Sequence, residues 1–171
     1  AGAPKGLFNV VQGRGSVGAQ LATHAGIAKV SLTGSVPTGA RVYAAAAEGM
    51  KHVTMELGGH APVIVARDAD LSKLIPLASQ WKFRNAGQVC VSPTRFYVQE
   101  GIYDAFVAGF AERTKKVKIG SGFDADTQMG PLANARRAPA LAAMVADAKA
   151  KGARVLAGGE ATGEGYFFQP T

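Results

Sequence analysis

The sequence contains little cysteine and no long apolar run. Cys90 is the only cysteine in 171 residues, which excludes an intrachain disulfide and favours a reducing compartment. No apolar run approaches the roughly 18 to 20 residues that span a bilayer, and the first residues lack the pattern of a signal peptide. The three histidines, His24, His52 and His60, lack the spacing of metal ligands. We therefore expect a soluble, cytoplasmic protein with no metal site and no membrane partner.

Acidic residues are missing from the first quarter of the chain. Glu48 is the first Asp or Glu, whereas four basic residues precede it: Lys5, Arg14, Lys29 and Arg41. The net charge of +7 is compatible with a nucleic-acid surface, but the basic residues are scattered along the chain. We therefore expect no nucleic-acid partner. An acid-free first quarter instead suits a small anionic ligand.

The composition that remains is that of an ordinary globular protein, with 47% hydrophobic and 18% charged residues. Predicted strands alternate with predicted helices, which indicates an α/β fold with a mostly parallel sheet, in parts of two lobes. The expected strands are residues 8–11, 29–32, 52–57, 61–66, 94–99 and 153–157. The expected helices cover about 19–24, 36–48, 71–81, 102–118 and 134–151, with a kink or a late start at Pro76 in the third.

Two glycine-containing turns are candidate anion sites. Residues 13–18 read G-x-G-x-x-G and include Gly15, but the acidic residue that a dinucleotide fingerprint expects about 20 positions on is missing. A plain tight turn is the alternative there. At the second turn, Ser35 is a natural N-cap, and the N–H groups and dipole of the helix that follows favour an anion. The sequence favours Ser35 over Gly15.

Cys90 and Glu56 are the residues that are most able to carry chemistry. Cys90 lies in a loop beside Gly87. A lone cysteine is by default an inert buried residue, and a thiol in a reactive setting is the alternative. Glu56 ends the alternating segment 52–57 and precedes two glycines, so it is either a general base or a member of a structural ion pair.

Three segments resemble the NAD(P)-dependent aldehyde dehydrogenase superfamily: residues 32–35 (LTGS), 55–59 (MELGG) and 83–90 (FRNAGQVC). The interval of 34 residues between Glu56 and Cys90 also resembles the family's separation of base and nucleophile. The similarity runs along essentially the whole chain. Residues 92–96, 120–123 and 130–132 look most like the succinate-semialdehyde dehydrogenase-like branch.

The resemblance implies both a fold and a reaction. Residues 1–57 would be the C-terminal part of a Rossmann-like cofactor domain, and residues 58–171 the first part of the catalytic domain. Cys90 would form a thiohemiacetal with an aldehyde, and hydride transfer from it to NAD or NADP would leave a thioester. Glu56 would activate the water that hydrolyses this thioester. The cofactor-binding residues implied by the resemblance are Gly34, Ser35, Gly39, Gly15 and Leu57.

The resemblance also implies that the chain is an internal piece of a longer enzyme, which would be a homo-oligomer. The family's second oxyanion donor and its ribose-binding residues fall outside these residues, so we expect the isolated chain to be inactive. Two alternatives stay open: a CoA-acylating relative, against which Glu56 counts, and a non-catalytic fragment. Arg95 would meet either a substrate carboxylate or a structural ion-pair partner. The sequence determines neither the aldehyde nor the choice between NAD and NADP.

Overall fold

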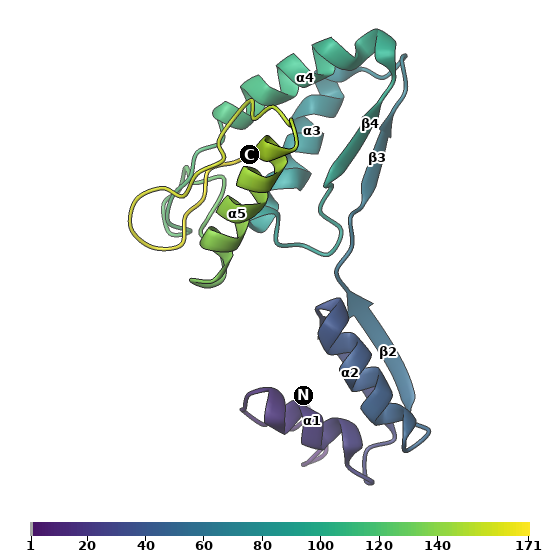
Figure 1. Ribbon diagram of the computed structural model, residues 1–171. Helices are drawn as coiled ribbons and strands as arrows, with labels where there is room; N and C mark the ends of the chain where they lie inside the picture. The colour runs from purple at the N-terminus through teal and green to yellow at the C-terminus, as the bar shows by residue number, and fades with distance from the viewer. Residues whose placement is uncertain (1) are drawn as a thin grey trace. The chain divides into compact units, whose positions relative to one another are not determined.

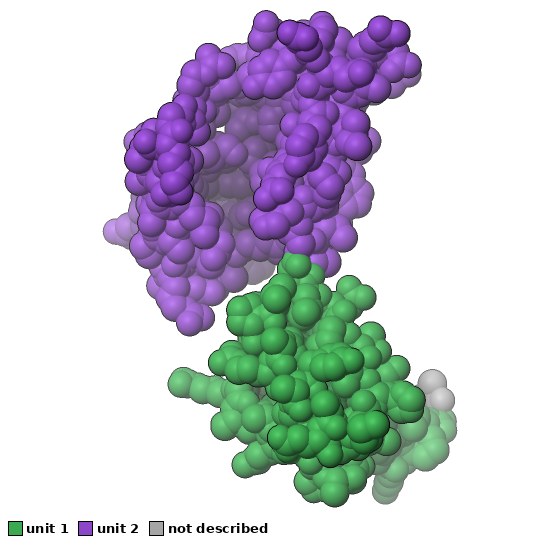
Figure 2. All heavy atoms as spheres, turned by 45° about the vertical axis from the view of Figure 1, so that its right-hand side comes forward, with its two compact units in different colours: residues 1–58 green, residues 59–171 purple. Residues whose placement is uncertain are grey.

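The computed structural model describes residues 2–171, which form two compact units (Figure 2). The first unit ends at Gly58 and the second covers residues 59–171. Each unit contains a parallel two-stranded sheet with helices (Figure 1). This arrangement confirms the predicted α/β class with parallel strands. The cofactor-binding and catalytic roles expected for residues 1–57 and 58–171 stay predictions.

The sheet of the first unit consists of β1 (Lys29–Gly34) and β2 (His52–Leu57). Helix α2 (Val36–Ala47) connects these strands and packs on both of them, and α1 (Gly15–Thr23) packs against α2. Along β2, exposed and half-buried residues alternate, as expected for a sheet that is covered on one face. The parallel crossover therefore has the common strand–helix–strand form.

The second unit contains two strands and three α-helices among its described residues. The strands are β3 and β4, which pair in parallel, and α3 packs against α4, which also contacts β4 (Figure 1). A short 3₁₀ turn, η1, follows α3 directly. The bounds are β3 Pro62–Val65, α3 Leu71–Phe83, η1 Arg84–Gly87, β4 Arg95–Val98, α4 Glu100–Lys115 and α5 Arg137–Ala150.

Phenylalanine rings form a core in the second unit. Phe96 of β4 has its ring centroid 5.6 Å from that of Phe106 and 5.1 Å from that of Phe110, both on α4. The Phe110 ring also lies 6.3 Å from Phe83 of α3. Aromatic pairs at such distances contribute about 0.5–1.5 kcal/mol each beyond the burial of their surface. The aromatic stripe of α4 therefore joins a helix pair to a strand.

Two predicted strands are wrong. Residues 8–11 and 153–157 lie outside any strand. Phe8 and Val10 keep 86% and 67% of their surface exposed, so little of the described chain covers them. Residues with a strand preference form a strand only when a neighbour supplies the hydrogen-bond ladder and a packing surface. Helix α1 also begins at Gly15, four residues before the predicted start.

The two helices with a predicted N-cap, α2 and α3, begin where the sequence predicts. The Asp70 carboxylate accepts a hydrogen bond from the Ser72 N–H at 3.0 Å and caps α3 as predicted. Of the kink or late start expected at Pro76, the late start is wrong, because α3 begins at Leu71 and includes the proline, and the kink stays a prediction. Past the end of α2, Met50 adopts the left-handed backbone (φ 49°). None of the helices within residues 2–171 is long and apolar enough to cross a membrane.

Candidate functional site

Four of the predicted site residues meet at one edge of the first sheet. The parallel register sets Gly34 beside Leu57 and Thr33 beside Glu56, so both strands end at the same level. Ser35 follows Gly34 directly and begins α2. Because ligands of parallel α/β sheets bind at the carboxyl ends of the strands, this edge has the position of a ligand site.

The Ser35 side chain organises the first turn of α2. Its Oγ accepts a hydrogen bond from the Thr38 N–H at 3.4 Å and donates to the Thr38 Oγ1 at 3.0 Å. The Arg41 guanidinium donates to the same Thr38 oxygen at 3.5 Å. The first turn of α2 contains no acidic residue. The positive end of the helix dipole and a guanidinium therefore act on the same region, which favours an anion there.

Gly39 is buried and allows α2 to lie close to the end of β2. A Cβ at this position would fall 2.7 and 2.8 Å from the two terminal methyl carbons of Leu57. Any larger residue would thus displace Leu57 from the edge. Gly39 shapes the candidate site through this packing, and its direct contact with a cofactor stays a prediction.

A cavity of about 720 Å³ lies between α1, β1 and α2. Gly15 and Gly18 line it, together with Thr38 and Arg41. A Cβ at Gly15 or Gly18 would meet no atom within 4 Å, so local packing does not require either glycine. The tight approach instead occurs at Gly13, whose Cβ would lie 2.3 Å from a methyl carbon of Val17. Gly13 is thus the glycine that the tight packing requires, whereas Gly15 and Gly18 line the cavity.

The loop before Cys90 contains three consecutive residues with left-handed backbone. Asn85 has φ 51° and ψ 38°, Ala86 has φ 53° and ψ 33°, and Gly87 has φ 73°. This conformation costs a residue with a Cβ roughly 1–2 kcal/mol. Two side-chain hydrogen bonds hold the turn: Asn85 Nδ2 donates to the Gln88 carbonyl at 3.1 Å, and Gln88 Nε2 donates to the Asn85 carbonyl at 3.0 Å.

Two further hydrogen bonds join the same loop to its surroundings. The Gln88 Oε1 accepts from the Ala133 N–H at 2.9 Å, which connects the loop to the segment after Leu132. The Ser92 hydroxyl, in a residue that is only 2% exposed, donates to the Lys82 carbonyl at 3.2 Å. Gln88 was not among the site residues predicted from the sequence. Its position between Gly87 and Cys90 was the only available signal.

Cys90 itself is exposed, so the expectation that a lone cysteine is buried is wrong for the described residues, and the reactivity of its thiol stays a prediction. Within residues 2–171, its backbone N–H donates to no protein acceptor. A Cβ on Gly59 would lie 3.4 Å from the Cys90 carbonyl oxygen, so the start of the second unit runs beside this loop. The thiol and a free backbone donor are therefore presented together.

Glu56 belongs to the first unit and Cys90 to the second, so their pairing stays a prediction. Glu56 is exposed and, within residues 2–171, takes part in no ion pair. The ion-pair alternative for Glu56 therefore finds no partner among these residues. In the chain, Glu56 precedes Gly59 by only three residues.

Two arginines flank the Cys90 loop. Arg95 is exposed at the start of β4 and has no ion-pair partner among the described residues. The guanidinium carbon of Arg84 lies 5.8 Å from the ring centroid of Trp81, within the range of a cation–π contact. No group of three or more His, Cys, Asp or Glu side chains that could hold a metal ion occurs within residues 2–171.

The chain is similar to known proteins along its whole length. The model of the aldehyde dehydrogenase family matches residues 1–171. Betaine aldehyde dehydrogenase of Cereibacter sphaeroides is 54% identical over 172 residues, which cover 100% of this chain and 36% of that protein. The chain thus spans about a third of the length of the curated relatives that it matches.

Solved structures match equally far along the chain. An NADP-dependent enzyme of E. coli superimposes with a TM-score of 0.94 at 44% identity, over 99% of this chain and 36% of that one. A betaine aldehyde dehydrogenase double mutant from Staphylococcus aureus, in complex with NAD+ and with a BME-modified cysteine, gives a TM-score of 0.93 at 37% identity. That match covers 99% of this chain and 35% of the other.

Proposed function

This chain belongs to the aldehyde dehydrogenase family, and on that basis we propose that the protein oxidises an aldehyde to a carboxylic acid with NAD or NADP. The observation that carries the proposal is the presentation of Cys90. An exposed thiol with a free backbone N–H follows a strained turn that side-chain hydrogen bonds hold in place. Strained backbone that is held in this way is typical of functional sites.

The first unit has features that fit a dinucleotide. Gly34 and Ser35 would hold a phosphate at the start of α2, where the helix end is positive and free of acidic residues. Leu57 would border the same edge, with Gly39 behind it. The cavity beside Gly15 would take the adenine end, as the resemblance implies. When bound, NAD or NADP would accept the hydride that the aldehyde loses.

Cys90 and Glu56 would carry the remaining chemistry. The Cys90 thiolate adds to the aldehyde carbon, and the backbone N–H of Cys90 donates to the resulting oxyanion, a contact worth about 3 kcal/mol in comparable reactions. Loss of hydride leaves a thioester on Sγ. Glu56 then takes a proton from water, the water oxygen attacks the thioester, and the carboxylic acid leaves as the thiolate is restored.

The test is the aldehyde-dependent formation of NADH or NADPH by a protein that carries this chain within the length of its relatives. We expect Cys90→Ala to abolish formation of the reduced cofactor. Val91→Ala, which changes the exposed neighbouring residue, is the matched control and should retain activity. A Cys90→Ala protein with activity near that of the unmodified protein would overturn the proposal.

The charge near Cys90 favours an aldehyde that also carries a carboxylate. Arg84 and Arg95 flank the Cys90 loop, and residues 71–99 contain no Asp or Glu. Betaine aldehyde has a quaternary ammonium group, which such surroundings disfavour. We therefore propose a semialdehyde as substrate, with Arg95 near its carboxylate. A higher kcat/KM for betaine aldehyde than for succinate semialdehyde would contradict this.

Two proposals concern the chain alone and the whole protein. The 171 residues by themselves should give no NAD(P)-linked aldehyde oxidation, because the resemblance assigns the second oxyanion donor and the ribose contacts to other positions. The whole protein should be a homo-oligomer, which size-exclusion chromatography with light scattering would check. A CoA-acylating enzyme is the alternative, and CoA-dependent formation of acyl-CoA would identify it.

A further inference from the structure

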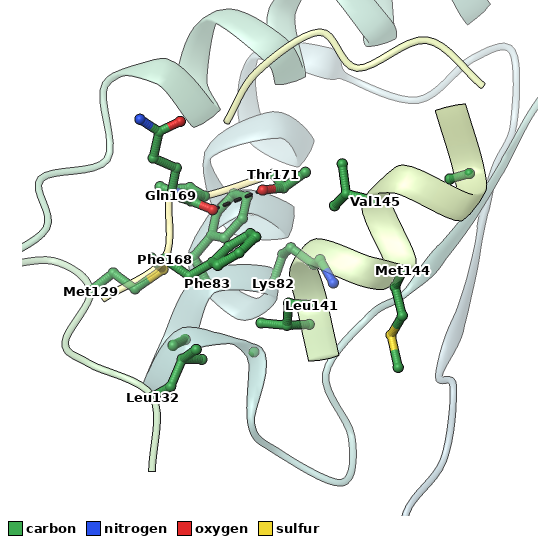
Figure 3. A pocket seen from close by; sticks show the side chains of 14 residues that line it. Lys82, Phe83, Met129, Leu132, Leu141, Met144, Val145, Phe168, Gln169 and Thr171 are labelled. Atoms are coloured by element: carbon green, nitrogen blue, oxygen red, sulfur yellow. Dashed lines mark hydrogen bonds between the residues drawn. The ribbon is translucent and has the colours of Figure 1, made fainter. Parts of the chain in front are cut away.

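The second unit contains a cavity of about 290 Å³ between the end of α3, the turn at Ala86–Gly87, α5 and the segment 168–171 (Figure 3). Its walls are largely apolar. Lys82 is the only residue with an ionisable side chain among those that line the cavity, and Figure 3 shows this side chain reaching toward Leu141. The apolar lining residues include Met129, Leu132, Leu141, Met144, Val145 and Phe168.

Lys82 differs from the paired lysines of the chain. Lys73, Lys115, Lys118 and Lys151 each pair with a carboxylate. Within residues 2–171, the amino group of Lys82 has neither an ion-pair nor a hydrogen-bond partner, and it keeps some contact with solvent. Its side chain is half-buried, and this burial lowers the pKa of Lys82 below the ordinary value for lysine. A larger share of this amine is therefore neutral and nucleophilic.

We propose that the Lys82 amino group is a second, covalent binding site for small apolar aldehydes. The neutral amine adds to the aldehyde carbon to give a carbinolamine. The nitrogen then loses its proton and the carbon loses the hydroxyl, so that water leaves and an imine forms. No oxidant or reductant takes part. The apolar walls hold the alkyl chain of the aldehyde.

This site is independent of the reaction at Cys90. The amine lies on α3, within the second unit, and it requires neither a cofactor nor Glu56. The lining contains no carboxylate side chain to hold the amine as an ammonium ion. An aldehyde with a negative charge would lose hydration on entering the apolar cavity, so the site should prefer uncharged aldehydes.

The test uses the Cys90→Ala variant of a protein that carries this chain within the length of its relatives, with butanal as the probe and borohydride to trap imines. Peptide mass spectrometry would then quantify the butyl adduct at each lysine. At about neutral pH we expect Lys82 to be labelled at least about threefold faster than Lys73, whose side chain is 85% exposed and ion-paired. Equal or slower labelling of Lys82 would overturn the proposal.

Two controls separate the cavity from simple amine reactivity. Glyoxylate, a charged aldehyde, should label Lys73 and Lys82 in a ratio that no longer favours Lys82. A preference for Lys82 that is equally strong with glyoxylate would contradict an apolar site. Lys82→Arg should remove the fast-labelling site and leave the rate at Lys73 unchanged, whereas a fast site elsewhere in that variant would show that the cavity lysine is not its source.

Discussion

At the scale of single residues, Gln88 connects the Cys90 loop to two other parts of the second unit. Its side-chain Nε2 donates to the Asn85 carbonyl, and its side-chain Oε1 accepts from the Ala133 N–H. Asn85 returns a hydrogen bond to the Gln88 backbone. The Gln88 side chain thus makes one hydrogen bond within the left-handed turn and another to a separate segment of the unit. We expect these hydrogen bonds to position Cys90, which lies two residues further along the chain.

Gln88→Ala removes both side-chain hydrogen bonds, so we expect the free energy of unfolding to fall by about 1–3 kcal/mol. Chemical denaturation of the chain would measure this loss. The rate of Cys90 alkylation by iodoacetamide in the native protein should also change. Gln88→Glu keeps the acceptor for the Ala133 N–H but loses the donor to the Asn85 carbonyl. Its free energy of unfolding should therefore lie between those of the unmodified protein and Gln88→Ala. An unchanged stability and alkylation rate in Gln88→Ala would exclude this positioning role.

Lys82 makes the stability of the fold depend on pH. Burial lowers the pKa of Lys82 below the ordinary value of 10.5, so the unfolded chain binds more protons than the folded chain between the folded pKa and 10.5. Stability rises with pH across that window. Below this pH window, Lys82 is an ammonium ion in both the folded and the unfolded chain, so the folded chain bears the full cost of desolvating it.

Lys82→Met removes this cost while it keeps an apolar stem of similar length. We therefore expect the variant to gain stability, with the gain largest below the folded pKa and smaller near pH 10.5. Urea denaturation at about pH 7 and about pH 10 would compare the two proteins. A gain that is the same at both values, or a loss at about pH 7, would contradict the desolvation of Lys82.

At the scale of elements, the sequence predicts what depends on local chemistry. Ser35 and Asp70 were recognisable as N-caps because each precedes a helical pattern and needs only its own first turn as a partner. Residues 8–11 and 153–157 carry strand-forming side chains, yet a strand needs a distant neighbour that local pattern does not reveal. The left-handed turn of Asn85 and Ala86 depends on Gln88 and Ala133, so no local rule predicts it.

Two helix glycines form a matched pair for testing element packing. Gly39 of α2 has Leu57 in the place of a Cβ, whereas a Cβ on Gly18 of α1 would meet nothing within 4 Å. Gly39→Ala should therefore lower the free energy of unfolding by about 1–3 kcal/mol through overpacking. Gly18→Ala should raise it by about 0.5–1 kcal/mol, because alanine costs less backbone entropy in a helix.

Thermal or urea unfolding of both variants would give the sign of each change. Only the opposite signs fit the packing of α2 on the end of β2. Equal stabilisation by both substitutions would mean that Leu57 moves aside at no cost, and the edge that Gly39 shapes would then be soft. Weaker binding of NAD or NADP to Gly39→Ala than to the unmodified protein would further favour the candidate cofactor site at that edge.

At the scale of the whole molecule, the proposed reaction divides its steps between the two units. Formation of the thioester needs Cys90, which lies in the second unit, and its hydrolysis needs a base, which we assign to Glu56 in the first. The sequence indicated both residues through the resemblance, but neither residue pattern nor the separate units determine how they meet. Kinetics of the whole protein address this division directly.

Glu56→Gln, in a protein that carries this chain within the length of its relatives, keeps the shape of the side chain and removes its basicity. Hydride transfer should still occur once, so the variant should release roughly one equivalent of NADH or NADPH per active site in a burst. Turnover after the burst should be very slow, because the thioester on Cys90 is not hydrolysed. Stopped-flow absorbance would follow both phases, and Glu48→Gln, on an exposed residue at the end of α2, is the control. Loss of the burst would show that Glu56 also deprotonates Cys90, whereas steady turnover near the unmodified rate would exclude Glu56 as the base.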